Sequence, residues 1–228
     1  MVYIVSLVMI ICVGGQKGGT GKSTTAVCLA AWLAGQKRDV LLIDANSAQG
    51  TASNWAERRA SYHADLPRVN CIEKSGNIYE AVRDLAQRYD EVIIDSGGQD
   101  SKELRTALPT SHMLLTPTRP SQADIETLIY VAELVTQAKD FNPNLEARVL
   151  ITNAPPNPAV KLVEEAKSLL ADLSETFSVA STVIYNRKAY IDALTAGLGV
   201  HELNNPKATA EIESLGKEIL RWQKKNKK

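Results

Sequence analysis

Short runs of apolar, largely β-branched residues recur along the chain and alternate with longer segments of helical periodicity. The runs at 40–43 and 92–94 are apolar at every position rather than at every second position, which is typical of strands that helices cover on both faces. Strands that alternate with helices in this way predict βαβ units and a parallel sheet. We therefore expect an α/β fold with one doubly wound, mostly parallel sheet flanked by helices.

The same pattern predicts the approximate limits of the elements. Strands are expected near residues 8–14, 39–44, 68–73, 91–95, 111–116, 147–152 and 180–184. Helices are expected near residues 22–36, 51–61, 77–89, 101–108, 121–139, 158–173, 187–196 and 206–225. No long linker or repeat interrupts the series, so residues 1–228 are expected to form one domain. Residues 1–8 are either an N-terminal extension or the product of a start upstream of Met9, and residues 221–228 form a basic tail.

The composition excludes several classes of protein. Hydrophobic residues make up 44% and charged residues 23% of the chain, which is a globular composition rather than a disordered one. The 26 basic and 26 acidic residues cancel, so nucleic-acid binding would need a local basic patch. The cysteines form no C-x-x-C pair, which argues against a zinc site or a disulfide framework and favours a reducing cytoplasm. The apolar stretch at 1–13 is too short for a membrane span.

Residues 14–24 read GGQKGGTGKST and lie between the first predicted strand and the first predicted helix. Glycines in this place let backbone N–H groups converge on an anion, and the helix N-terminus adds partial positive charge. Lys22 would contact the β- and γ-phosphates of a nucleotide, and the Ser23 hydroxyl would ligate Mg²⁺. The predicted nucleotide-binding residues of the loop are Gly18, Gly19, Thr20, Gly21, Lys22, Ser23 and Thr24.

The loop departs from the common P-loop pattern at Gln16, which stands in place of the first glycine, and at the additional Lys17. The segment QKGGTGKST resembles the deviant Walker A motif of the ParA/MinD ATPases, and in particular that of the ParA partition branch. The resemblance implies a P-loop NTPase fold with ATP and Mg²⁺ as cofactors. It also implies catalytic roles for Lys22 and for Lys17, which would cross a nucleotide-sandwich dimer to the partner subunit's phosphates. A cation from a second subunit would stabilise phosphoryl transfer as an arginine finger does.

Two further segments extend this resemblance. Residues 44–50, DANSAQG, resemble the family's D-x-D-P-Q-G switch region with one extra residue, which implies a catalytic role for Asp44. The family's second aspartate, assigned to positioning or activating the attacking water, is Asn46 in this chain. An amide can hold a water molecule but cannot accept its proton, so we expect slow hydrolysis. Asp95, after an apolar run, resembles the Walker B aspartate and would hold Mg²⁺ through water.

Asn153 follows the apolar run at 149–151, which resembles one of the family's later strands. This asparagine is a candidate for contact with adenine. A turn or capping role explains an asparagine at such a place equally well.

Basic residues gather in two places. Residues 187–188 begin a predicted helix that resembles the ParA stretch with DNA-contacting basic residues, and the last predicted helix carries lysines and arginines around its polar face. In a dimer these patches would double and bind DNA without sequence preference and in a salt-dependent way. The expected DNA-binding residues are Arg187, Lys188, Lys217, Arg221, Lys224 and Lys225. A solvated helix face with a lysine tail is the alternative.

The resemblance implies a cytoplasmic, nucleoid-associated ATPase that dimerises on ATP, coats DNA and segregates a plasmid or chromosome. A centromere-binding, ParB-like partner would stimulate its hydrolysis. One alternative is a MinD-like positioning ATPase whose last helix lies on a membrane, although the apolar face of such a helix is usually buried in the fold, so no stable membrane anchor is expected. Another is a nucleotide-dependent binding switch with negligible turnover, which Asn46 favours.

Overall fold

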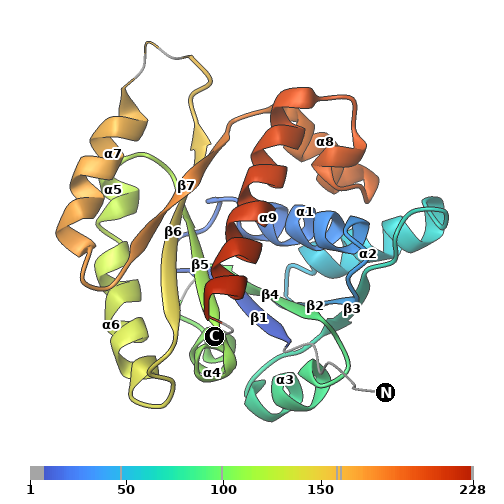
Figure 1. Cartoon of the computed structure of the whole chain (residues 1–228), viewed down its shortest axis with the longest axis horizontal. Coiled ribbons are helices and arrows are strands. Elements are labelled where there is room, and N and C mark those ends of the chain that lie inside the picture. The colour runs from blue at the N-terminus through green and yellow to red at the C-terminus, as the bar shows by residue number, and fades with distance from the viewer. Residues whose placement is uncertain (1–7, 47, 99, 158, 160, 227–228) are drawn as a thin grey trace.

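The computed structural model describes residues 8–46, 48–98, 100–157, 159 and 161–226. Its strands form one seven-stranded sheet in the order β3-β2-β4-β1-β5-β6-β7 (Figure 1). Each neighbouring pair of strands is parallel. The strands are β1 (Met9–Gly15), β2 (Val40–Ala45), β3 (Asn70–Glu73), β4 (Glu91–Gly98), β5 (Met113–Thr118), β6 (Glu146–Ala154) and β7 (Ser178–Tyr185).

Helices connect the strands and cover both faces of the sheet. They are α1 (Lys22–Gly35), α2 (Thr51–Tyr62), α3 (Tyr79–Ala86), α4 (Lys102–Ala107), α5 (Gln122–Ile125), α6 (Leu128–Lys139), α7 (Leu162–Leu170), α8 (Lys188–Ala196) and α9 (Pro206–Asn226). Short 3-10 turns lie at Leu108–Thr110, Ala171–Leu173 and Val200–Glu202. None of the described helices is long and apolar enough to cross a membrane.

Successive residues of a strand face opposite layers of helices. In β1, Met9, Ile11 and Val13 belong to the core that packs against α1, α2, α8 and α9. Ile10 and Cys12 belong to the second core, which packs against α3, α4, α5, α6 and α7 (Figure 1). Because both faces of the sheet are buried, the strand sequences are apolar at successive positions. The predicted α/β class and doubly wound architecture are confirmed, and the sheet is parallel throughout its described strands.

The predicted helix at 121–139 is two helices in the structure. α5 ends at Ile125 and α6 begins at Leu128. Between them the Thr127 hydroxyl donates to the carbonyl oxygen of Asp124 at 2.6 Å, and such a side-chain bond competes with the helical ladder. The predicted start of the next helix, at residue 158, lies outside the described residues, and α7 begins at Leu162.

The strand order brings the predicted site to one edge of the sheet. Because the strands are parallel, the loops that follow β1, β2 and β4 all leave from the carboxyl edge, where open α/β sheets bind ligands. Asp44 of β2 is in register with Asp95 of β4, and Gly15 of β1 is in register with Gly98 of β4. The segments singled out in the sequence therefore meet at the ends of three adjacent strands.

Candidate functional site

The loop between β1 and α1 is open to solvent at its tip. Gly18 and Gly19 are exposed, and among the described atoms none lies within 4 Å of a Cβ built on either residue. Gly19 and Gly21 have φ angles of 71° and 89°, in the left-handed region that favours glycine. The loop thus presents backbone N–H groups at the N-terminus of α1, which is a favourable place for an anion.

Lys22, the first residue of α1, points back over this loop. Its Nζ donates to the carbonyl oxygen of Lys17 at 2.7 Å. The residue is 7% exposed, and burial lowers the pKa of its ammonium group, while the carboxylate of Asp95 opposes this change. The Thr152 hydroxyl of β6 donates to the carbonyl oxygen of Thr20 at 2.7 Å and holds the other side of the loop. A buried ammonium with one carbonyl partner has donors left for phosphate oxygens.

Asp44 and Asp95 are buried side by side but have different environments. Asp44 accepts hydrogen bonds from the backbone N–H of Asn46 at 3.0 Å and of Ser53 at 2.9 Å. Among the described residues, neither carboxylate oxygen of Asp95 has a hydrogen-bond partner. Burial raises the pKa of Asp95 to about 7; the Asp44 carboxylate also raises it, whereas the nearby Ser23 hydroxyl and Lys22 ammonium lower it.

The environment of Asp95 fits a divalent cation. An orphaned buried carboxylate is costly, and a cation or its bound water would supply the missing partner. Carboxylate and hydroxyl oxygens are also the ligands that Mg²⁺ prefers. Ser23 lies close enough to influence the pKa of Asp95, so Ser23 and Asp95 are suited to hold Mg²⁺ together, directly or through water.

Asn46 lies against the glycines at the end of β4. A Cβ built on Gly97 would lie 3.3 Å from the side-chain amide of Asn46. The amide nitrogen of Asn46 donates to Oε1 of Gln49 at 3.0 Å. The side chain of Asn46 therefore lies beside the end of β4, and its amide NH₂ group is engaged by Gln49 of its own loop. Gly98 is equally close to the P-loop, because a Cβ there would lie 2.8 Å from Nζ of Lys22.

Lys17 is held by a residue that the sequence pattern did not single out. Its Nζ lies 3.3 Å from Oδ2 of Asp124 in α5. The Asp124 side chain is 5% exposed and also accepts hydrogen bonds from Arg119 Nε at 3.0 Å and from the Ser121 hydroxyl. The pattern Ser121-x-x-Asp124 could have been recognised as a helix N-terminus. Nothing local in the sequence indicates that this aspartate meets the P-loop.

Asn153 stands at the end of β6 in a left-handed conformation, with a φ of 52°. Its amide nitrogen lies 3.8 Å from the place of a Cβ on Gly21. Beside it is a cavity of about 160 Å³, whose lining includes Thr24, Asn186 and Tyr190. A wider hollow of about 770 Å³ between α2 and β3 contains none of the predicted site residues.

The predicted DNA-binding residues fall into two groups. Three of them have carboxylate partners at 2.7, 2.7 and 2.8 Å, namely Arg187 with Glu211, Lys188 with Asp192 and Lys217 with Glu213. Within the described part of the chain, Arg221, Lys224 and Lys225 form no ion pair. A phosphate must displace the partner of a paired cation but not of an unpaired one, so the second group is the better candidate for binding a polyanion.

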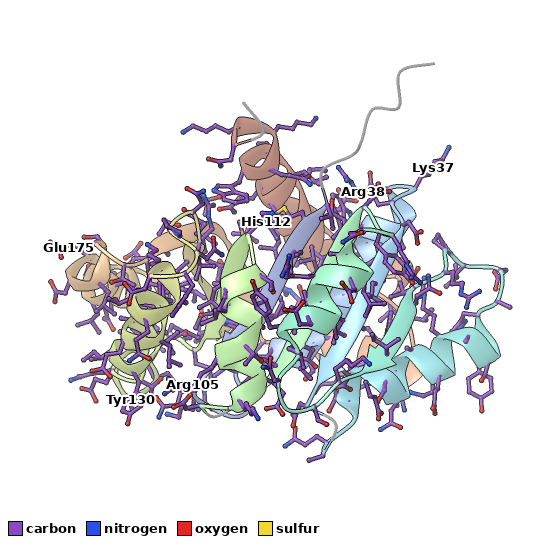
Figure 2. The ribbon with its side chains drawn as sticks, turned by 90° about the horizontal axis from the view of Figure 1, so that it is seen from below. Lys37, Arg38, Arg105, His112, Tyr130 and Glu175 are labelled. Carbon is purple, nitrogen blue, oxygen red and sulfur yellow. The ribbon has the colours of Figure 1, made fainter. Side chains whose placement is uncertain are left out.

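The beginning and the end of α9 lie at opposite edges of the sheet. Glu211 accepts a hydrogen bond at 3.2 Å from the backbone N–H of Tyr185, the last residue of β7. Gln223 donates at 3.5 Å to Glu91, the first residue of β4, and Figure 2 shows Arg38 at this amino edge. A helix of 21 residues is about 30 Å long. The six basic residues are therefore spread along the sheet rather than gathered in one patch.

Known proteins resemble long stretches of this chain. It matches the family model described as ATPase MipZ over residues 9–140. It is 33% identical over 221 residues to the maintenance of carboxysome distribution protein A of Gloeobacter kilaueensis, covering 94% of this chain and 96% of the relative. It is 26% identical over 198 residues to the chromosome partitioning protein ParA of Myxococcus xanthus, covering 69% and 70%.

Solved structures share the fold. Apo McdA of Cyanothece superimposes with a TM-score of 0.75 at 20% identity, covering 93% of this chain and 99% of that one. A plasmid partition protein of Borrelia burgdorferi bound to AMPPNP has a TM-score of 0.70 at 20% identity, covering 94% and 99%. The family match extends over more than half of the chain and includes the P-loop, Asp44 and Asp95. The protein thus belongs to the MipZ family of ParA/MinD-like P-loop ATPases.

Proposed function

We propose that this protein is a ParA-like ATPase that forms an ATP sandwich dimer, binds DNA non-specifically and distributes a cargo along it. The cargo is a plasmid or chromosome, or a protein compartment of the kind named in the carboxysome relative. Hydrolysis is slow and is stimulated by a ParB-like partner. Membership of this ATPase family makes ATP and Mg²⁺ its cofactors. One observation supports this proposal most directly. The P-loop, which contains Lys17, lies at the same edge of the sheet as Asp44 and Asp95.

In this proposal each site residue has a physical role. The backbone N–H groups of residues 18–24 surround the phosphates, and Lys22 exchanges its bond with the Lys17 carbonyl for bonds to the β- and γ-phosphates. Ser23 and Asp95 hold Mg²⁺, which neutralises charge on the phosphoryl oxygens when bound. Asp44 keeps the Asn46 loop in place through its backbone hydrogen bond. Asn153 contacts the base in the adjoining cavity.

The γ-phosphate distinguishes the two states of the switch. With ATP bound, Lys17 and the switch loops bridge two subunits, and after hydrolysis this bridge opens and the dimer loosens. DNA affinity rises with dimerisation because a dimer carries two weak sites, each of which can bind a separate stretch of DNA, so that one contact holds the protein while the other dissociates. Arg221, Lys224 and Lys225, which lack ion-pair partners within the described chain, supply most of the phosphate contacts.

The first test measures binding of a non-specific DNA duplex in Mg-ATP and in Mg-ADP across a salt series. We expect binding that is tight in ATP only and falls steeply with salt, because phosphate contacts release counterions. Lys22→Ala is the matched control, since it should abolish nucleotide binding and with it the difference between the two states. Equal binding in both nucleotides, or none in either, contradicts the proposal that ATP controls attachment to DNA.

A second candidate is a nucleotide-dependent binding switch with negligible turnover. The observation that favours it is Asn46, whose amide donates to Gln49 and has no group that can accept a proton from water. If this residue limits the rate, Asn46→Asp should raise ATP turnover at least about tenfold, because a general base usually contributes more than that. Steady-state phosphate release measures the effect. An unchanged rate would show that position 46 does not limit turnover.

The burial of α9 argues against attachment to a membrane through this helix. Ile212, Leu215 and Ile219 are at most 2% exposed and belong to the core that contains α1. The apolar face that a bilayer would take is therefore occupied by the fold, as is usual for the last helix of a doubly wound domain.

A further inference from the structure

Two contacts hold Lys17 inside its own subunit. Its ammonium group pairs with Asp124 at 3.3 Å, and its carbonyl oxygen accepts the hydrogen bond from Lys22 at 2.7 Å. The first contact occupies the Lys17 ammonium group, which the proposed dimer needs at the partner's phosphates. The second occupies the Lys22 ammonium group, which the phosphates of the same subunit need as a donor. The pair with Asp124 must open before the Lys17 ammonium group can reach a partner subunit.

Asp124 is built to keep its own charge after Lys17 leaves. Its side chain is 5% exposed, and Arg119 donates to Oδ1 at 3.0 Å while the Ser121 hydroxyl donates to Oδ2. Burial alone would raise the pKa of this carboxyl group, but the bonds from Ser121, Arg119 and Lys17 together lower it. Since two of these partners remain when Lys17 departs, the carboxylate is not left as an unpaired buried charge.

We propose that Asp124 is a positioning residue that retains Lys17 within its own subunit. It thereby sets the concentration of nucleotide-bound protein at which the dimer forms. This inference rests on the proposed crossing role of Lys17. Nucleotide binding acts first, because phosphates that take the Lys22 ammonium free the Lys17 carbonyl. Transfer of the Lys17 ammonium from Asp124 to the partner's phosphates follows. Arg119 favours this transfer by sharing the carboxylate.

The experiment measures the dimer dissociation constant of the full chain by sedimentation velocity in Mg-AMPPNP, which avoids turnover. Asp124→Asn removes the charge and keeps one acceptor oxygen for Arg119, while the Ser121 hydroxyl can accept a hydrogen bond from the new amide NH₂. We expect its dimer to be about tenfold tighter, because two ion pairs no longer have to break per dimer. Its affinity for ADP should stay within about twofold of wild type. Asp192→Asn, which removes the exposed pair with Lys188, is the matched control and should leave the dimer constant unchanged.

Arg119→Gln should change the dimer dissociation constant in the opposite direction from Asp124→Asn. The Arg119 side chain is 41% exposed, so its replacement disturbs the fold little. The substitution should weaken the dimer about threefold by leaving more of the Asp124 charge to Lys17, and it should have no effect in the Asp124→Asn background. It also keeps the inference testable if Asp124→Asn does not fold. An effect of Arg119→Gln that persists in that background would overturn the inference.

Lys17→Ala separates this inference from the function on which it rests. Loss of the dimer in Lys17→Ala together with an unchanged or weaker dimer in Asp124→Asn would reject the role of Asp124 and leave the proposed function standing. A dimer that persists in Lys17→Ala would reject the crossing role itself. Tighter association in Asp124→Asn and loss of association in Lys17→Ala would support both.

Discussion

At the level of single residues, the site combines two aspartates whose environments differ. Asp44 accepts hydrogen bonds from two backbone N–H groups. The adjacent Asp95 is buried without a hydrogen-bond partner among the described residues, and its pKa is raised to about 7. In the proposed function, the carboxylate of Asp44 holds the loop at Asn46 and that of Asp95 binds the cation.

This contrast predicts how stability depends on pH without nucleotide and with a chelator present. Asp95 ionises near 3.8 in the unfolded chain and near 7 in the folded one. The folded state therefore holds the extra proton between these values, so the free energy of unfolding falls as pH rises through this range, by up to about 4 kcal/mol. Asp95→Asn lacks this titration and should gain stability relative to wild type between pH 5 and pH 8.

Urea unfolding of both proteins at the two pH values measures the difference, and titrations common to both cancel. Parallel pH dependence of wild type and Asp95→Asn would contradict the assignment. Adding Mg²⁺ at pH 8 should stabilise wild type more than Asp95→Asn, because the ionised carboxylate is the proposed ligand.

At the level of secondary-structure elements, α9 depends on one glycine for its place on the sheet. A Cβ on Gly216 would lie 2.2 Å from the ring of Trp32 in α1, and Trp32 is itself 3% exposed. The two helices therefore approach more closely than any side chain at position 216 allows. The close packing buries the apolar face of α9 and aligns its basic end with the amino edge.

Gly216→Val should consequently lower the free energy of unfolding by about 3 kcal/mol, because a buried ring has little room to move. Ser214→Ala, at an exposed position of the same helix, is the control and should stay within about 0.5 kcal/mol of wild type. Urea denaturation measures both. Equal stability of the two variants would show that α9 can shift to accept the added side chain.

In the molecule as a whole, the nucleotide site and the basic residues Arg221, Lys224 and Lys225 are at opposite edges of the sheet. The P-loop follows β1 at the carboxyl edge, while Gln223 fixes the end of α9 beside Arg38 and the start of β4. Figure 2 shows Lys37 and Arg38 together at this amino edge. If two subunits join through their nucleotide sites, the ends of the two α9 helices point away from the junction. DNA contacts there would be present in each subunit before it dimerises.

The double variant Lys224→Gln/Lys225→Gln should therefore weaken DNA binding in both nucleotide states. The slope of log affinity against log salt should become shallower by about 2, because each removed lysine leaves one DNA phosphate without a cation. Lys217→Gln, whose lysine is paired with Glu213, should change the slope by less. Fluorescence anisotropy with a labelled duplex measures these slopes. A weakening confined to the ATP state would instead place Lys224 and Lys225 at a surface that only the dimer forms.

The fold class and the chemistry of the loop follow from the sequence without knowledge of the structure. Apolar runs with burial on both faces require a covered parallel sheet, and a strand, a glycine-rich loop with Lys22, and a helix together predict a phosphate site. These features depend on residues that are close in the chain. The seven strands appear where the pattern predicts them, with β4 extending to Gly98.

Which distant residues share an environment became known only from the three-dimensional arrangement. The strand order places Asp44 beside Asp95, and α5 brings Asp124 to Lys17. The structure also shows that Arg187 is paired with Glu211, near the start of α9. The basic residues at the end of α9 are far from this pair, because the helix is about 30 Å long. The physical reason is that ion pairs and burial depend on distances in space, which arise only when the strand order and the helix packing are complete.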